Sequence, residues 1–94
     1  MVSQWAKRLG VGPRNIFVQK MKTQWGSCNH RNKSIRLNTE LTKKPKQYLD
    51  YVVLHEMAHL LKPTHSKEFI SILDEHMPMW REIKKGLNEL PVGN

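Results

Sequence analysis

The sequence has only one cysteine, Cys28, among its 94 residues. A single cysteine excludes a disulfide within the chain and fits a reducing compartment, so we expect a cytoplasmic protein. Long hydrophobic runs are missing as well, since no stretch approaches the roughly 20 apolar residues that cross a bilayer. The segment 1–8 also lacks the apolar core of a signal peptide. We therefore expect a soluble protein without a membrane partner.

Acidic residues are scarce in the first half of the chain. Residues 1–46 contain eleven Lys or Arg and one acid, Glu40, whereas residues 47–94 contain five Lys or Arg and seven acids. A basic half of this kind is either a solvated surface or a surface that attracts an anionic partner, nucleic acid or an acidic polypeptide. Aromatic residues are few in this half, and that sparsity does not favour a binder of single strands.

A chain of this length has room for one small domain, which we expect to span residues 1–94 as a monomer with a thin core. The first half predicts a short amphipathic helix over residues 2–9, anchored by Trp5, and then a strand over 15–21. Residues 23–29 run through Gly26, which indicates a bulge or a close backbone approach. Residues 34–38 alternate apolar and polar, which predicts a half-exposed strand that pairs with the first.

The second half predicts three helices. The first starts near Thr42 or Lys43, has Pro45 in its first turn, and ends at Lys62 before a proline. The second covers residues 67–76 with Ser66 as its N-cap. The third covers residues 79–90, and residues 91–94 form a frayed tail. Strands followed by helices predict an α+β domain.

The segment around residues 50–61 is an apolar helix that carries two histidines and a glutamate. His55 and His59 are four residues apart, so both imidazoles leave the same helix face. Glu56 lies roughly 100° further round, close enough to reach a water held by the two rings. This H-E-x-x-H spacing is typical of zinc metallopeptidases.

A catalytic zinc usually has three protein ligands and one open position. We favour His65 as the third ligand, because it stands at a helix start where packing of Phe69 would fix its direction. The remaining candidates are two histidines and two carboxylates, namely His30, His76, Glu68 and Glu75.

The chemistry predicted for this site is hydrolysis by metal-activated water, with Glu56 as general base. A donor to the tetrahedral oxyanion is often needed, and the candidates are Tyr51, His30 and Arg31. Tyr51 is also a typical core-edge tyrosine. At Trp25-Gly26-Ser27 a substrate backbone can approach and add as an extra strand, although a structural bulge explains the same residues. Cys28 is expected to be a small packed residue.

Several segments together resemble the YgjP-like metallopeptidase domain, which is related to the SprT-like and WLM proteases within the zincins. They are Thr23–Cys28, Ile35–Asn38, Asp50–His59 and His65–Phe69. The resemblance covers most of residues 1–90. It implies a minimal zincin fold, with a small antiparallel sheet over an active-site helix and a following helix. It also implies zinc bound by His55, His59 and His65, with Glu56 catalytic.

Two departures from related patterns stand beside this resemblance. Family members are commonly longer, with a further β-rich N-terminal region, and a metzincin would have glycine where this chain has Lys62. The sequence therefore supports two hypotheses. The first is a zinc peptidase that acts on peptide or protein substrates. The second is a non-enzymatic basic module that zinc stabilises and that binds nucleic acid or protein.

Overall fold

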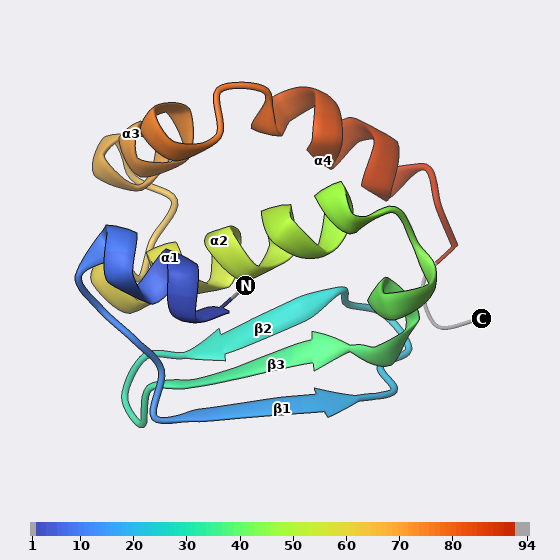
Figure 1. Ribbon diagram of the computed structural model, residues 1–94, viewed down its shortest axis with the longest axis horizontal. Coiled ribbons are helices and arrows are strands. Elements are labelled where there is room, and N and C mark those ends of the chain that lie inside the picture. The colour runs from blue at the N-terminus through green and yellow to red at the C-terminus, as the bar shows by residue number, and fades with distance from the viewer. Residues whose placement is uncertain (1, 92–94) are drawn as a thin grey trace.

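The computed structural model describes residues 2–91. The elements are α1 (Val2–Leu9), β1 (Asn15–Gln19), β2 (Gly26–Asn29), β3 (Ser34–Asn38), the 3-10 helix η1 (Thr39–Lys43), α2 (Lys46–Leu61), α3 (Lys67–His76) and α4 (Trp80–Asn88). The sheet covers one side of α2, and α3 and α4 lie on its other side (Figure 1). The predicted α+β class is confirmed, as are the sheet packed on the central helix and the two further C-terminal helices.

The sheet has the strand order β1-β3-β2 and is mixed. β2 and β3 are antiparallel, whereas β1 runs parallel to β3, with Ile16 opposite Ile35. The expected antiparallel sheet is therefore wrong for one of its two pairings. The reason is that the chain reverses direction twice between β1 and β3, first in residues 20–25 and then in the β2–β3 turn, which contains Lys33 at φ 55°. Two reversals leave β3 running in the same direction as β1.

Two strand predictions need correction. Residues 26–29 form a regular strand, so of the two alternatives predicted at Gly26 the bulge is wrong. The hairpin partner supplies a ladder that a glycine-containing segment does not reveal. Residues 34–38 are not half-exposed: only Arg36 is exposed, because this strand is central. Ile35 and Leu37 join the core, and the side chain of Ser34 donates to Asn32 at 2.6 Å on the other face.

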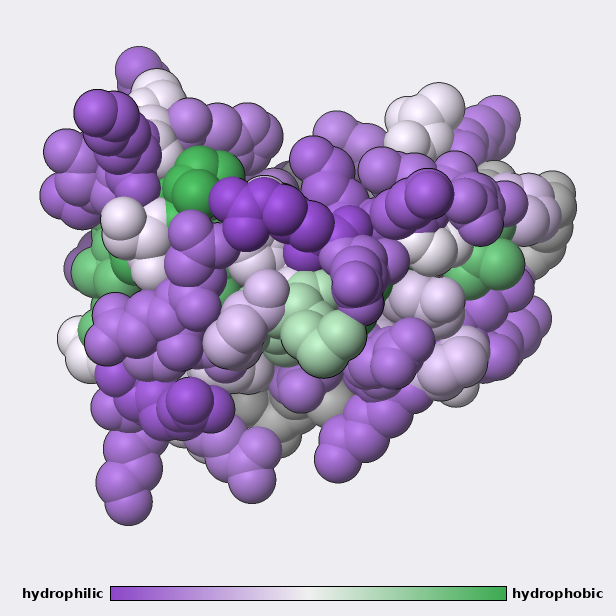
Figure 2. Space-filling model, turned by 90° about the horizontal axis from the view of Figure 1, so that it is seen from above, coloured by the Kyte–Doolittle hydropathy of each residue, from purple (hydrophilic) through white to green (hydrophobic). Residues whose placement is uncertain are grey.

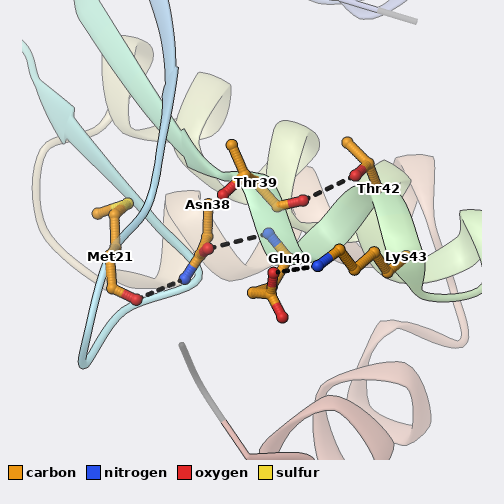
Figure 3. A network of polar contacts seen from close by, with 6 residues as sticks. All are labelled: Met21, Asn38, Thr39, Glu40, Thr42 and Lys43. Atoms are coloured by element: carbon orange, nitrogen blue, oxygen red, sulfur yellow. Dashed lines mark hydrogen bonds and ion pairs between the residues drawn. The ribbon is translucent and has the colours of Figure 1, made fainter. Parts of the chain in front are cut away.

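Asn38 ties the end of β3 to the loop before β2 (Figure 3). Its buried amide nitrogen donates to the carbonyls of Met21 at 2.9 Å and Gln24 at 2.8 Å, and its oxygen accepts from the Glu40 backbone N–H at 3.0 Å. The third contact caps η1. Residues 39–43 thus form a turn of their own, so α2 begins at Lys46, later than predicted.

The central helix α2 is buried over most of its circumference. Seven of its sixteen residues are buried: Tyr51, Val52, Val53, Leu54, Glu56, Met57 and Ala58. A helix with this pattern needs cover on all sides, which the sheet, α1, α3 and α4 supply. No helix within residues 2–91 has the length and apolarity needed to cross a bilayer.

The other helices follow the sequence closely. Ser66 caps α3 by accepting from the Phe69 backbone N–H at 3.3 Å, as predicted. Trp5 anchors α1, with its indole N–H donating to Asp50 at 2.8 Å. The last helix is shorter than predicted, from Trp80 to Asn88. Most of the expected tail, residues 92–94, lies outside the described residues.

The strand β1 forms the sheet edge farthest from α2 (Figure 1). All five of its residues are exposed, including the apolar Ile16, Phe17 and Val18. The guanidinium of Arg36 lies over the Phe17 ring, 5.7 Å from its centroid. The predicted strand extended to residue 21, but pairing stops at Gln19 where the partner strand ends.

Candidate metal centre

Two histidines project from the last turns of α2. His55 and His59 are one turn apart, and their ring centroids are 4.9 Å from each other. The helix ends at Leu61, and the carbonyl of Lys62 lies 3.3 Å from Nδ1 of His59. Because a carbonyl oxygen can only accept, Nδ1 carries the proton and Nε2 keeps the lone pair that a metal needs.

His65 returns to the same place after the chain leaves α2. Its Nε2 lies 3.1 Å from Nε2 of His59, and the ligand atoms of His55, His59 and His65 all lie within 4.8 Å of one another. Nitrogens that share a tetrahedral zinc at 2.0–2.1 Å are about 3.3 Å apart. The turn across Pro63, followed by the Ser66 cap of α3, therefore places a third imidazole at a distance suited to a metal.

The ring of Phe69 packs against the rings of all three histidines. Its ring centroid lies 5.2 Å from that of His55, 4.5 Å from that of His59 and 4.9 Å from that of His65. Phe69 is only 1% exposed, so it cannot move aside easily. The sequence predicted that Phe69 would fix the direction of His65. In the structure Phe69 also contacts His55 and His59.

The residues fit a divalent transition metal. Burial, and then the neighbouring His55, lower the pKa of His59 and so favour the neutral imidazole that binds metals. Three imidazoles suit zinc, copper, iron or nickel better than magnesium or calcium. Within residues 2–91 this is the one group of three such side chains with metal-ligand spacing.

Glu56 lies beside the cluster and is buried. One of its carboxylate oxygens is 3.2 Å from Nδ1 of His55, which leaves Nε2 of His55 as the nitrogen that can bind a metal. Burial, with a further contribution from the charge of Glu56, raises the pKa of Cys28 to about 11 and that of Tyr51 to about 12. The carboxylate charge therefore reaches both side chains.

Two cavities meet at Glu56 and His55. The cavity beside β2, here the β2 cleft, has a volume of about 310 Å³ and is bordered by Gly26, Ser27 and Cys28 as well as the three histidines. The cavity under α4, here the α4 pocket, has a volume of about 230 Å³ and is bordered by Trp25, Gly26 and Tyr51. The four substrate-binding candidates thus all border one of the two cavities that adjoin the histidine cluster.

The other candidate ligands do not belong to the three-histidine group. His30 borders the β2 cleft but does not belong to the three-histidine group. The ring of His76 packs edge-on against Trp5, with 6.1 Å between centroids. Glu68 and Glu75 are exposed on α3. Arg31, a candidate oxyanion donor, is exposed in the hairpin turn.

Tyr51 and Lys84 border the space around His55. The Tyr51 ring stacks on Trp80, with 6.5 Å between centroids and 4° between planes, and lies 5.7 Å from the His55 ring. Lys84 borders the α4 pocket and a smaller cavity of about 110 Å³ that also touches His55. Sequence reasoning missed Lys84, because an exposed lysine on an amphipathic helix carries no signal of its neighbours.

Solved structures that share this fold include two metallopeptidase zymogens. The first is the crystal structure of the metallopeptidase zymogen of Pyrococcus abyssi abylysin, whose sequence is 20% identical to this one. The superposition has a TM-score of 0.83 and covers 92% of this chain and 87% of that chain. The second is the metallopeptidase zymogen of Methanocaldococcus jannaschii jannalysin, which is 23% identical, with a TM-score of 0.81 over 94% of this chain and 90% of that chain. The fold is therefore one that small metallopeptidases adopt.

The family follows from the sequence itself. The model of the YgjP-like metallopeptidase domain matches residues 1–90, and the chain belongs to this family. The resemblance noted from the sequence is confirmed. Membership in a metallopeptidase family implies a metal ion, and the three histidines form a group that can bind one. A search of curated proteins found no sequence that matches this chain.

Proposed function

We propose that this protein is a zinc-dependent peptidase in which His55, His59 and His65 hold the ion and Glu56 is the general base. One observation carries the proposal: three imidazole nitrogens converge within 4.8 Å beside a buried carboxylate. This group borders a surface cleft that can admit a substrate. A structural zinc site, in contrast, would have a fourth protein ligand and no use for a base.

Zinc is the preferred ion because it accepts three neutral imidazoles and leaves a position for water. When bound, it supplies Lewis acidity, which lowers the pKa of water toward about 7 and polarises a carbonyl group. The Lys62 carbonyl orients the His59 ring, and Phe69 fixes the planes of all three rings. Such support keeps ligands in place before the metal arrives.

Glu56 moves the proton. Its carboxylate accepts a proton from the attacking water while the water oxygen bonds to the peptide carbonyl carbon. It then passes that proton to the amide nitrogen as the C–N bond breaks, so the products are a carboxylic acid and an amine. Burial of Glu56 beside His55 holds the carboxylate within reach of the cleft.

The substrate is expected to bind along β2. This strand is at the edge of the sheet, and among residues 2–91 it pairs only with β3, so its outer edge can form backbone hydrogen bonds to an extended peptide. Gly26 and Ser27 border the β2 cleft, and Trp25 and Tyr51 border the α4 pocket on the other side of Glu56. A peptide lying along β2 can therefore place one side chain in each cavity.

The test is Glu56→Gln, which keeps the size of the side chain and removes the base. With zinc bound, the wild type should cleave an unfolded protein or a peptide library, and the variant should be about 10²- to 10⁴-fold slower. Glu75→Gln, an exposed change on α3, is the matched control and should retain activity. Equal rates for wild type and Glu56→Gln, with zinc bound in both, would overturn the proposal.

A non-enzymatic zinc module is the competing hypothesis. It predicts that the wild type and Glu56→Gln each bind one zinc ion and that neither cleaves any substrate. Binding to nucleic acid through the basic residues 1–46 is a separate question, and a salt-dependent affinity for DNA answers it. Absence of retention on DNA at low salt would leave the basic half as a solvated surface.

A further inference from the structure

The α4 pocket joins the metal centre to the C-terminal helix. His55 and Glu56 border both this pocket and the β2 cleft, so the pocket opens beside the reacting group of the proposed peptidase. Its volume of about 230 Å³ greatly exceeds the roughly 30 Å³ share of one water. It can therefore hold a side chain of several heavy atoms.

The pocket walls are mostly apolar. Trp25, Tyr51, Val52 and Leu87 are all buried and border it. An apolar pocket of this kind suits an aliphatic stem.

The charge at the pocket comes from Lys84. Lys84 and Asn88 lie one turn apart on α4. Both border the pocket, next to the buried Leu87. The neighbouring Arg81 is paired with Asp74 at 2.7 Å, whereas Lys84 takes part in no ion pair among residues 2–91. Its ammonium lies 6.0 Å from the Trp80 ring centroid. Within residues 2–91, Lys84 is the one lysine or arginine that borders this pocket.

We propose that the α4 pocket recognises the substrate and that Lys84 binds a carboxylate of the substrate, carried on an aliphatic stem. The inference rests on the proposed peptidase function and names its substrate class: peptides with glutamate next to the cleaved bond. Aspartate is a poorer fit, because its short stem leaves the carboxylate closer to the negative Glu56. A free C-terminal carboxylate offers the same chemistry from a second source.

The helical face around α4 agrees with selection by charge. Seen from above, the surface is mainly hydrophilic, with hydrophobic residues in small separate groups (Figure 2). A purely apolar recognition site would expose a continuous apolar area. The pocket itself is bordered by buried apolar side chains and by the charged Lys84.

The experiment uses zinc-loaded protein and blocked peptides that differ at one position: Glu, Gln, Asp or Lys. We expect kcat/KM for Glu to exceed that for Gln by about two- to fivefold, as for one partly exposed ion pair. Lys84→Gln should remove this ratio, and Lys84→Glu should shift the preference toward Lys. Lys85→Gln is the matched control, because Lys85 is the next residue of α4 and does not border the pocket.

A second readout separates this inference from the peptidase proposal. The Glu56→Gln variant should bind the Glu peptide about two- to fivefold more tightly than the Gln peptide, as measured by fluorescence anisotropy. A parallel peptide pair with free and amidated C-termini shows whether the terminal carboxylate is the preferred source. If the wild type cleaves peptides and Lys84→Gln keeps the full Glu-to-Gln ratio, the inference fails and the peptidase stands. If nothing is cleaved and both peptides bind equally, both fail.

Discussion

Gly26 on β2 lies directly against Glu56 on α2: a Cβ atom at position 26 would stand 3.2 Å from Cγ of Glu56. It would also stand 2.7 Å from a methyl carbon of Val52, closer than real Cβ contacts come. The missing side chain therefore lets the strand approach the helix at the residue proposed as general base. The close approach predicted from the sequence is present, and the helix is what approaches.

The first prediction concerns Gly26→Ala. The added methyl group overpacks the contact between β2 and α2, so we expect a loss of about 1–3 kcal/mol in the free energy of unfolding. Gly12→Ala is the control, because a Cβ there meets Ala6 at an ordinary 3.5 Å. Urea denaturation measures both. If both variants unfold at the same urea concentration, the packing argument is wrong. Val52→Ala added to Gly26→Ala should recover part of the loss attributed to the clash.

The second prediction concerns Asn38. Asn38→Ala leaves the carbonyls of Met21 and Gln24 and the N–H of Glu40 without their partner, at about 1–3 kcal/mol for each group that stays buried. We expect a total loss of about 2–4 kcal/mol, with the loop before β2 loosened. Thr42→Ala removes an exposed hydrogen bond in the same region and should cost under about 1 kcal/mol. Chemical denaturation compares the two variants, and equal losses would refute the buried network.

The third prediction concerns the metal. Zinc at about 100 times its dissociation constant adds about 2.7 kcal/mol to the free energy of unfolding, and for a domain of this size that raises Tm by more than about 10 °C. His65→Ala should lose most of this rise, whereas His76→Ala, which lies against Trp5, should keep it. Thermal unfolding with and without a chelator measures the shift. An unchanged zinc shift in His65→Ala would remove His65 from the ligand set.

The fourth prediction concerns the thiol of Cys28. Burial and the Glu56 charge raise its pKa from 9.0 to about 11, so at pH 8 the thiolate population is about a hundredfold below that of an ordinary cysteine. Alkylation by iodoacetamide should be slower than in urea-unfolded protein by about that factor. Glu56→Gln removes one of the two causes and should speed alkylation of the folded protein. A fast reaction in native protein would contradict the buried, anionic setting.

The fifth prediction is a pH dependence of the metal-free protein. The pKa of His59 is lowered below 6.5 in the folded state. Below about pH 6.5 the unfolded chain therefore binds a proton on His59 more readily than the folded chain does. The free energy of unfolding should therefore fall as pH drops below about 6.5, by at most about 1.4 kcal/mol per pH unit from this group. His59→Gln should flatten that slope. An identical slope in both proteins, measured by urea titration at several pH values, would rule out the assignment.

The helices and the two histidines that share a face of α2 were predictable because their signals are local. A histidine four residues from another must share its face, and Ser66 before residues 67–76 is a cap wherever that helix forms. The sheet was harder. Nothing within residues 26–29 indicates a regular strand, and this extra strand adds the second chain reversal that makes β1 parallel to β3. Lys84 was also missed, because its neighbours come from distant segments.

The bare outer strand β1 has a consequence for how these molecules behave together in solution. Ile16, Phe17 and Val18 lie exposed on an edge that has a partner on one side only, which invites pairing with the same edge of another copy. The net charge of +8 opposes such encounters by mutual repulsion. That repulsion reaches about 10 Å at 0.1 M salt and only about 3 Å at 1 M. We therefore expect concentrated salt to weaken the repulsion that keeps the β1 edges of two molecules apart.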